Sequence, residues 1–263
     1  MLSVTAAQLD AWLAALMFPL TRLLGLFASA TLWSNRGIPV RIRLAAGLAI
    51  AMAVLPALPP MPAIPVDSWH ALGVLAHQFL IGAAIGFTIR LVLAAVDLAG
   101  EMIGLQMGLS FAVFFNPTTG GQSSVVAEFL NLLTLLVFLA LDGHLMLIKI
   151  LVQTFQWLPV GEATAAQGWL VIVRYASVMF VAGVLMALPM IATLLIANIG
   201  LGVLTRAAPQ LNLFAVGFPV TLTVGFIVLL VSLSVLAPAL HSLIEQGFSA
   251  IEALLLALTA QTP

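Results

Sequence analysis

Residues 100–122 read G-E-M-I-G-L-Q-M-G-L-S-F-A-V-F-F-N-P-T-T-G-G-Q, and this stretch combines a packing surface with a loop. Small residues recur in it every four positions and share one stripe of a helix: Gly100, Gly104, Gly108 and Ala112. In an apolar environment, such a stripe lets a second backbone approach closely. We therefore expect the glycines of this stripe to pack against a neighbouring helix.

The second half of the stretch predicts an irregular loop. Pro117 disfavours the helical conformation at Asn116, and the pair Gly120-Gly121 favours a turn, so the helix should end near Phe115. Three aromatic rings lie where the helix gives way to the loop: Phe111, Phe114 and Phe115. An uncharged loop of this kind is tolerated at membrane depth only where it is buried in protein or lines a cavity.

Composition indicates an integral membrane protein. Hydrophobic residues make up 63% and charged residues 6% of the chain, and the mean hydropathy is +1.24, whereas a soluble domain carries about 25% charged residues. The net charge of −1, without a dense basic cluster, excludes nucleic acid as a partner. The chain has no cysteine and no G-x-S-x-G, H-E-x-x-H or P-loop motif, so we predict no enzymatic activity, no metal site and no cofactor.

Long apolar segments follow one another along the chain. Because the first charge is acidic Asp10, the first segment is not predicted to be a cleaved signal peptide. The run from Trp69 to Ala112 exceeds one membrane crossing, which predicts a break or a tilted extension beyond the bilayer. Pro238 should end the last strongly apolar segment. We expect segments at 6–33, 44–58, 69–112, 125–141, 145–157, 169–199 and 214–236.

Charged residues suggest sidedness and one polar contact. Arginines crowd the connection after the first segment, and Arg206 lies in a turn-rich connector from Gly200 to Asn212, so the positive-inside rule places both on the cytoplasmic side. Arg90, Asp97 and Glu101 share one helical face. We interpret these three as a polar clamp between helices, the alternative being that they lie at the cytoplasmic membrane interface.

The end of the chain predicts an amphipathic helix. Its polar face is acidic, with Glu245 and Glu252, which disfavours attraction to anionic lipids and favours packing against a partner protein. Its apolar face follows helical spacing and comprises Leu240, Leu243, Ile244, Phe248, Ile251, Leu254, Leu255 and Leu258.

Four motifs resemble the FliR family of flagellar biosynthesis proteins, and the resemblance covers essentially the whole chain. They are G-E-M-I-G-L-Q-M-G-L-S-F-A at 100–112, F-x-N-P at 114–117, D-G-H at 142–144 and N-I-G-L-G-V-L-T-R-A-A-P-Q-L-N-L-F-A-V-G-F-P at 198–219. Many relatives have Asp where Asn116 stands, so a charge in that loop would be missing here.

The resemblance implies an all-α polytopic membrane protein of long helices and helical hairpins. It would be a subunit of the flagellar type III secretion export gate, in the bacterial inner membrane. With P-type and Q-type subunits it would form a closed channel through which unfolded flagellar proteins are exported. Further implied partners are the B-type and A-type membrane subunits and the ring and rod proteins of the basal body. An injectisome export gate is the alternative; a small-molecule transporter would predict inverted repeats and a charged midplane site, and neither is found.

The resemblance also implies a division of the chain and roles for particular residues. Residues 1–168 would resemble a P-type subunit and contain a plug loop at 111–122. Residues 169–263 would resemble a Q-type hairpin with the amphipathic C-terminal helix. Arg206 would lie in the cytoplasmic loop of that hairpin. The residues implied to close the channel are Phe111, Phe114, Phe115, Asn116, Pro117, Gly120 and Gly121.

Overall fold

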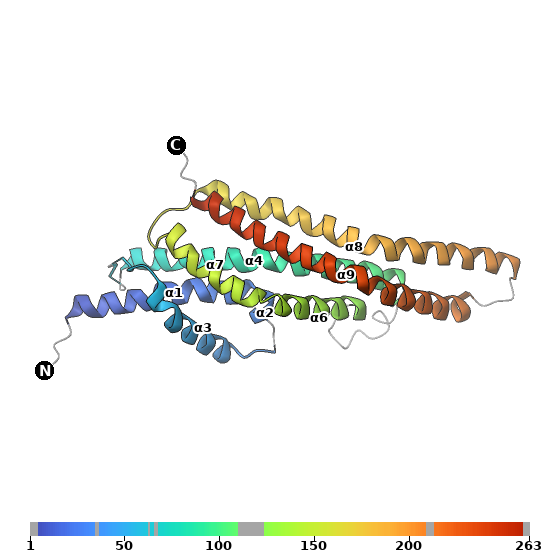
Figure 1. Cartoon of the computed structure of the whole chain (residues 1–263), viewed down its shortest axis with the longest axis horizontal. Coiled ribbons are helices and arrows are strands. Elements are labelled where there is room, and N and C mark those ends of the chain that lie inside the picture. The colour runs from blue at the N-terminus through green and yellow to red at the C-terminus, as the bar shows by residue number, and fades with distance from the viewer. Residues whose placement is uncertain are drawn as a thin grey trace. The chain divides into compact units, whose positions relative to one another are not determined.

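The computed structural model describes residues 5–34, 37–62, 64–65, 68–109, 124–208 and 213–259. Within these residues the chain forms helices and connecting segments and no strand, which confirms the expected all-α class (Figure 1). The elements are α1 (Ala6–Ser29), α2 (Thr31–Ser34), α3 (Val40–Val54), the 3-10 helix η1 (Leu55–Ala57), α4 (Trp69–Gln106), α6 (Val125–Ala140), α7 (Gly143–Trp157), α8 (Ala166–Ala207) and α9 (Leu213–Thr259).

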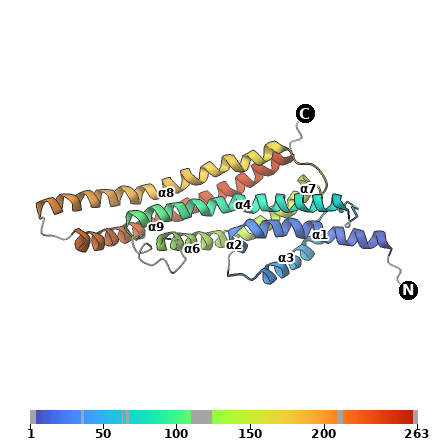
Figure 2. The ribbon, with the colours of Figure 1, turned by 180° about the vertical axis from the view of Figure 1, so that it is seen from behind.

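The helices form two compact units. Unit 1 contains residues 1–91, 141–176 and 246–263, and unit 2 contains residues 92–140 and 177–245. Figure 2 shows the long helices α4, α8 and α9 from behind. Each of them contributes residues to both units. Each unit therefore draws on segments from both sides of Gly168, and the predicted division of the chain at that residue stays a prediction.

In unit 1, α1 and α4 touch backbone to backbone. A Cβ atom added to Gly82 would collide with the carbonyl oxygen of Arg22, and one added to Gly25 would collide with the carbonyl oxygen of Phe79. One turn further along α4, a Cβ on Gly86 would lie 2.7 Å from the carbonyl oxygen of Leu26. The spacing Gly82-x-x-x-Gly86 thus permits the same close approach as the stripe that begins at Gly100.

In unit 2, α4 meets α6, α8 and α9 through small residues. A Cβ on Gly100 would lie 2.7 Å from the backbone nitrogen of Ala127 in α6, and one on Gly183 of α8 would lie 2.8 Å from the carbonyl oxygen of Ala95. A Cβ on Gly225 of α9 would lie 2.7 Å from the side chain of Met107. These contacts hold four helices close together with few intervening atoms.

The end of α4 differs from the prediction. The helix has no break in its 38 residues, and it ends at Gln106 and not near Phe115. Gly108 has a φ of 82°, its N–H donates to the Leu105 carbonyl at 3.0 Å, and the Leu109 N–H donates to the Gly104 carbonyl at 3.0 Å. These two bonds form a Schellman motif, in which glycine is favoured because it lacks a Cβ. The expected place of Gly108 on the helical packing stripe is therefore wrong, because Gly108 caps the helix.

Two other helices are longer than predicted. α8 continues through Gly200 and Gly202 to Ala207, and α9 continues through Pro238 to Thr259. A helix satisfies its own backbone hydrogen-bonding groups, which is strongly favourable in apolar surroundings. This gain exceeds the low helix propensity of glycine and the one backbone hydrogen bond that a proline removes. The expected connector from Gly200 and the expected boundary at Pro238 are wrong for this reason.

The amphipathic pattern at the end of α9 correctly identifies a buried face. All eight apolar residues predicted for that face, from Leu240 to Leu258, are at most 6% exposed. The backbone oxygen of Leu258 accepts a hydrogen bond from the Ala165 N–H at 3.0 Å, and its side chain lies against Gly168. This chain itself covers the apolar face, and the expected packing of the helix against a partner protein stays a prediction.

Five helices among the described residues are long and apolar enough to cross a membrane. If α6 and α7 together form one bent span, the number of possible spans is six. Three of these apolar stretches are unusually long: 38 residues in α4, 42 in α8 and 44 in α9. At about 1.5 Å per residue, they measure about 57–66 Å, whereas the hydrocarbon core of a bilayer is about 30 Å thick. The fold is that of a polytopic membrane protein whose longest helices exceed the bilayer.

Candidate functional site

In unit 2, a hydrogen bond joins α4 to the residue that follows the segment 110–123. Glu101 Oε1 in α4 accepts a hydrogen bond from the backbone N–H of Ser124, 2.8 Å away. Ser124 is 5% exposed, and its Cβ would lie 2.9 Å from a Cβ added to Gly104. The residues predicted for the plug lie outside the described residues: Phe111, Phe114, Phe115, Asn116, Pro117, Gly120 and Gly121. The structure describes the contact between α4 and Ser124 on either side of this segment, made by Glu101, Gly104 and Ser124, and we call this contact the base of the segment.

The two carboxylates of the predicted clamp face α6 and the residue before it. The side-chain amide of Asn131 donates a hydrogen bond to Asp97 Oδ1, and Glu101 holds Ser124 as described above. Arg90 lies on the same helix and is exposed. The structure therefore connects α4 and α6 through Asp97 and Glu101, while the participation of Arg90 in the clamp stays a prediction.

Next to this base, an apolar groove of about 580 Å³ lies between α6 and α9. Val125 and Phe129 of α6 form one wall, and Phe226 and Leu230 of α9 form the other. Leu109, the last described residue before the segment, also lines the groove. The base of the predicted plug thus opens onto an apolar surface.

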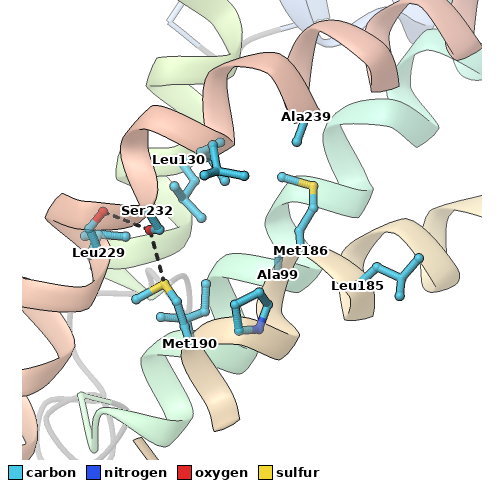
Figure 3. A pocket seen from close by; sticks show the side chains of 12 residues that line it. Ala99, Leu130, Leu185, Met186, Met190, Leu229, Ser232 and Ala239 are labelled. Atoms are coloured by element: carbon cyan, nitrogen blue, oxygen red, sulfur yellow. Dashed lines mark hydrogen bonds between the residues drawn. The ribbon is translucent and has the colours of Figure 1, made fainter. Parts of the chain in front are cut away.

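A second apolar cavity, of about 320 Å³, lies between the helices of unit 2 (Figure 3). Met186 and Met190 of α8 reach into it. Among the residues that line the cavity, Ser232 of α9 has the one hydroxyl group. The Ser232 hydroxyl donates to the Leu229 carbonyl at 2.9 Å and lies 3.9 Å from the Met190 sulfur. Because this hydroxyl already has an acceptor within its own helix, the cavity presents an apolar lining with adaptable thioethers.

Arg206 does not lie in a loop as predicted. It occupies the last turn of α8, where its cation favourably faces the negative end of the helix dipole, and its side chain is exposed. The loop placement is wrong because α8 continues past both glycines of the expected connector.

Arg22 is a residue that the sequence analysis did not single out. It lies in the second half of α1 in unit 1, and its side chain is 0% exposed. Its Nε donates to Gln78 Oε1 at 2.8 Å, its Nη1 donates to Thr154 Oγ1 at 2.8 Å, and its Nη2 donates to the Leu158 carbonyl at 2.9 Å. The guanidinium carbon lies 3.9 Å above the centre of the Phe155 ring. A charged residue within an apolar helix is a signal that could have drawn attention to this position.

These arrangements define a class of protein. Long apolar helices and close backbone packing between them belong to a polytopic membrane protein. Comparison with known proteins specifies this class further.

The family described as bacterial export proteins, family 1, matches residues 13–247. The chain is 42% identical over 250 residues to the flagellar biosynthetic protein FliR of Escherichia coli (strain K12), with 95% of each chain covered. It is 39% identical to the protein of that name in Pectobacterium carotovorum, with 94% of this chain and 95% of the relative covered. It is 29% identical to the protein of that name in Bacillus subtilis (strain 168), with 84% and 87% covered. The chain belongs to the FliR family of bacterial export proteins, which confirms the resemblance drawn from its motifs.

Proposed function

We propose that this chain is a subunit of the flagellar type III export gate in the bacterial inner membrane. Its FliR relatives bear the name of flagellar biosynthetic proteins, and the family is one of export proteins. In this proposal the chain joins P-type and Q-type subunits to form a closed channel for unfolded flagellar proteins. The B-type and A-type membrane subunits and the ring and rod proteins of the basal body are its further partners.

The observation that carries assembly with other subunits is the exposed apolar surface of α8 and α9. Ile196 of α8 is 70% exposed and Leu230 of α9 is 71% exposed. No charged residue occurs in α8 between Arg174 and Arg206. These helices measure about twice the hydrocarbon thickness, so lipid can cover only part of their apolar length. The rest requires contact with other protein, as in a multisubunit gate.

We further propose that the segment at 111–122 closes the channel at rest. Its large apolar rings, Phe111, Phe114 and Phe115, favour a position away from water. Asn116, Pro117 and Gly120-Gly121 disfavour continuation of the helix. The hydrogen bond between Glu101 and Ser124 supports this role because it fixes the base of the segment to two packed helices.

The remaining predicted sites support the same function. Gly100 and Gly104 permit the contact between α4 and α6 that holds the base together, and Gly108 ends α4 directly before the segment. Arg90, Asp97 and Glu101 form the proposed polar clamp. Arg206, at the exposed end of α8, marks the cytoplasmic side in this proposal.

Co-purification and complementation test the proposal together. A tagged chain, expressed with the flagellar genes of its host, should co-purify with small hydrophobic P-type and Q-type subunits. A deletion of its gene should abolish swimming and the secretion of flagellar proteins, and the cloned gene should restore both. Full motility of the deletion strain combined with loss of injectisome secretion would assign the chain to the alternative system. Normal secretion by both systems would contradict the export function.

A further inference from the structure

The hydrogen bonds of Arg22 come from helices that are far away in the sequence. Gln78 of α4 lies 56 residues downstream of Arg22, Thr154 of α7 lies 132 residues downstream, and Leu158 at the end of α7 lies 136 residues downstream. α1 itself supplies none of the acceptors that the structure shows for this side chain. The guanidinium of Arg22 therefore has all of these hydrogen-bond acceptors only when α4 and α7 both lie against α1.

All of these acceptors are uncharged. The guanidinium binds a side-chain amide oxygen, a hydroxyl and a backbone carbonyl, and it lies over the aromatic face of Phe155. A guanidinium has five N–H donors in a fixed planar geometry and does not lose its charge in proteins. Without this set of acceptors, Arg22 would need water or lipid head groups to stabilise its charge.

The surrounding packing leaves the Arg22 guanidinium little room to reach other hydrogen-bond acceptors. The backbones of α1 and α4 touch at Gly25 and Gly82, directly beside Arg22. Gln78 and Thr154 are both 0% exposed, as is Arg22 itself. The hydroxyl of Thr154 also donates to the Leu151 carbonyl at 2.5 Å, which orients its oxygen to accept from Arg22. Bulk water therefore does not reach these side chains to replace a lost acceptor.

We propose that Arg22 makes the burial of α1 conditional on α4 and α7. During synthesis, α1 emerges long before Thr154 and Leu158, so its cation stays at an aqueous or head-group surface until α7 is in place. α1 then docks, and the guanidinium joins the three helices. In the finished protein, the loss of one acceptor raises the population in which α1 is displaced from its place against α4 and α7, because a buried charge left unpaired is strongly unfavourable.

The experiment uses the full-length chain in detergent, with one cysteine as a reporter. The chain has no native cysteine, and Ala14 of α1 is 1% exposed, so Ala14→Cys reports the burial of α1 through its rate of reaction with N-ethylmaleimide. In that background, Thr154→Val removes the hydroxyl and should raise the reaction rate by about tenfold to a hundredfold. Thr154→Ser retains the hydroxyl and should leave the rate near its original value.

The decisive comparison places Gln78→Leu in two backgrounds. With Arg22 present, Gln78→Leu should raise the rate by about tenfold or more. In the Arg22→Met background, Gln78→Leu should leave the rate unchanged or lower it, because no buried cation then requires the amide. Thr134→Val serves as control, since Thr134 is also 0% exposed but donates to the Leu130 carbonyl of its own helix at 2.7 Å. Equal effects of Gln78→Leu in both backgrounds, or equal effects of Thr154→Val and Thr154→Ser, would overturn the proposal.

Discussion

The carboxylate of Glu101 accepts a hydrogen bond from the backbone N–H of Ser124 across 2.8 Å. Glu101 lies one and a half turns before the end of α4, and Ser124 lies directly before α6. One hydrogen bond therefore joins α4, which precedes the predicted plug, to the residue directly before α6, which follows it.

The first prediction concerns that bond. Glu101→Leu removes the acceptor and leaves the N–H of a residue that is 5% exposed without a partner, which should lower the stability by about 1.5–3 kcal/mol. Glu101→Gln retains an acceptor oxygen and should lose less. Thermal unfolding of the purified chain in detergent measures both variants. Identical melting temperatures for the two would show that the bond to Ser124 contributes nothing.

The second prediction concerns the contact between α4 and α6. Gly100→Ala places a Cβ against the backbone of Ala127, so the helices must separate, and we expect a loss of about 1–3 kcal/mol together with a lower yield of the assembled gate. The matched control is Gly73→Ala on the same helix, where a Cβ meets no atom within 4 Å. Alanine is the better helix former there, so that variant should be neutral or more stable. Equal losses for the two variants would refute the packing role of Gly100.

A third prediction follows from the φ of 82° at Gly108. Gly108→Ala should cost about 1–2 kcal/mol, because a Cβ is strained in the left-handed region. Gly108→Asn should cost less, since asparagine tolerates that conformation better. Denaturant unfolding of both variants measures the difference. If alanine and asparagine were equally well tolerated, the cap would not require this backbone conformation.

A fourth prediction separates two adjacent leucines near the end of α9. Leu255 is 0% exposed and Leu256 is 65% exposed. Leu255→Ala should cost about 2–5 kcal/mol through the cavity that it leaves, whereas Leu256→Ala should stay within about 0.5 kcal/mol in the purified chain. Unfolding measurements on the chain without partners provide the comparison. A stable Leu255→Ala variant would mean that this face is not covered by the chain itself.

The fifth prediction tests the proposed plug in living cells. Phe111→Ala combined with Phe114→Ala removes two rings whose burial is worth roughly 1.5–3 kcal/mol each, so the open population should rise by about a hundredfold or more. Cells that carry this variant in an assembled gate should leak ions and small solutes. Conductance measurements and co-purification of the gate subunits check leakage and assembly separately. Normal conductance in an assembled gate would exclude these rings from closing the channel.

Local patterns predicted much of this fold, and contacts between distant residues account for what they missed. The spacing of apolar residues identified the buried face of α9 from Leu240 to Leu258, because burial on a helix follows its 3.6-residue period. The same reasoning placed Gly108 on a packing stripe, although a hydrogen-bonded cap that ends α4 decides its role. Local propensity predicts a boundary at Pro238, but it does not include the benefit of an unbroken helix in apolar surroundings, and α9 continues past this residue.

In the candidate site too, local patterns predicted some features and missed those that depend on distant residues. The small-residue spacing at Gly100 and Gly104 indicated close packing without identifying Ala127 and Ser124 as the neighbours. Gly82 and Gly86 carry the same spacing and also pack against a neighbouring helix, which was not predicted. Arg22 is a lone charge in the sequence, and its acceptors lie 56 to 136 residues away, so no local pattern reveals that they converge.

The exposed apolar faces of α8 and α9 affect the steady-state amount of this protein in the cell. In the proposed gate, other subunits cover the part of this apolar surface that lipid cannot cover, so a chain inserted in the membrane without them would leave that part exposed. Surplus copies would be substrates for membrane proteases and quality control. The steady-state amount of the chain should therefore follow the supply of its partners more closely than the rate of its own synthesis.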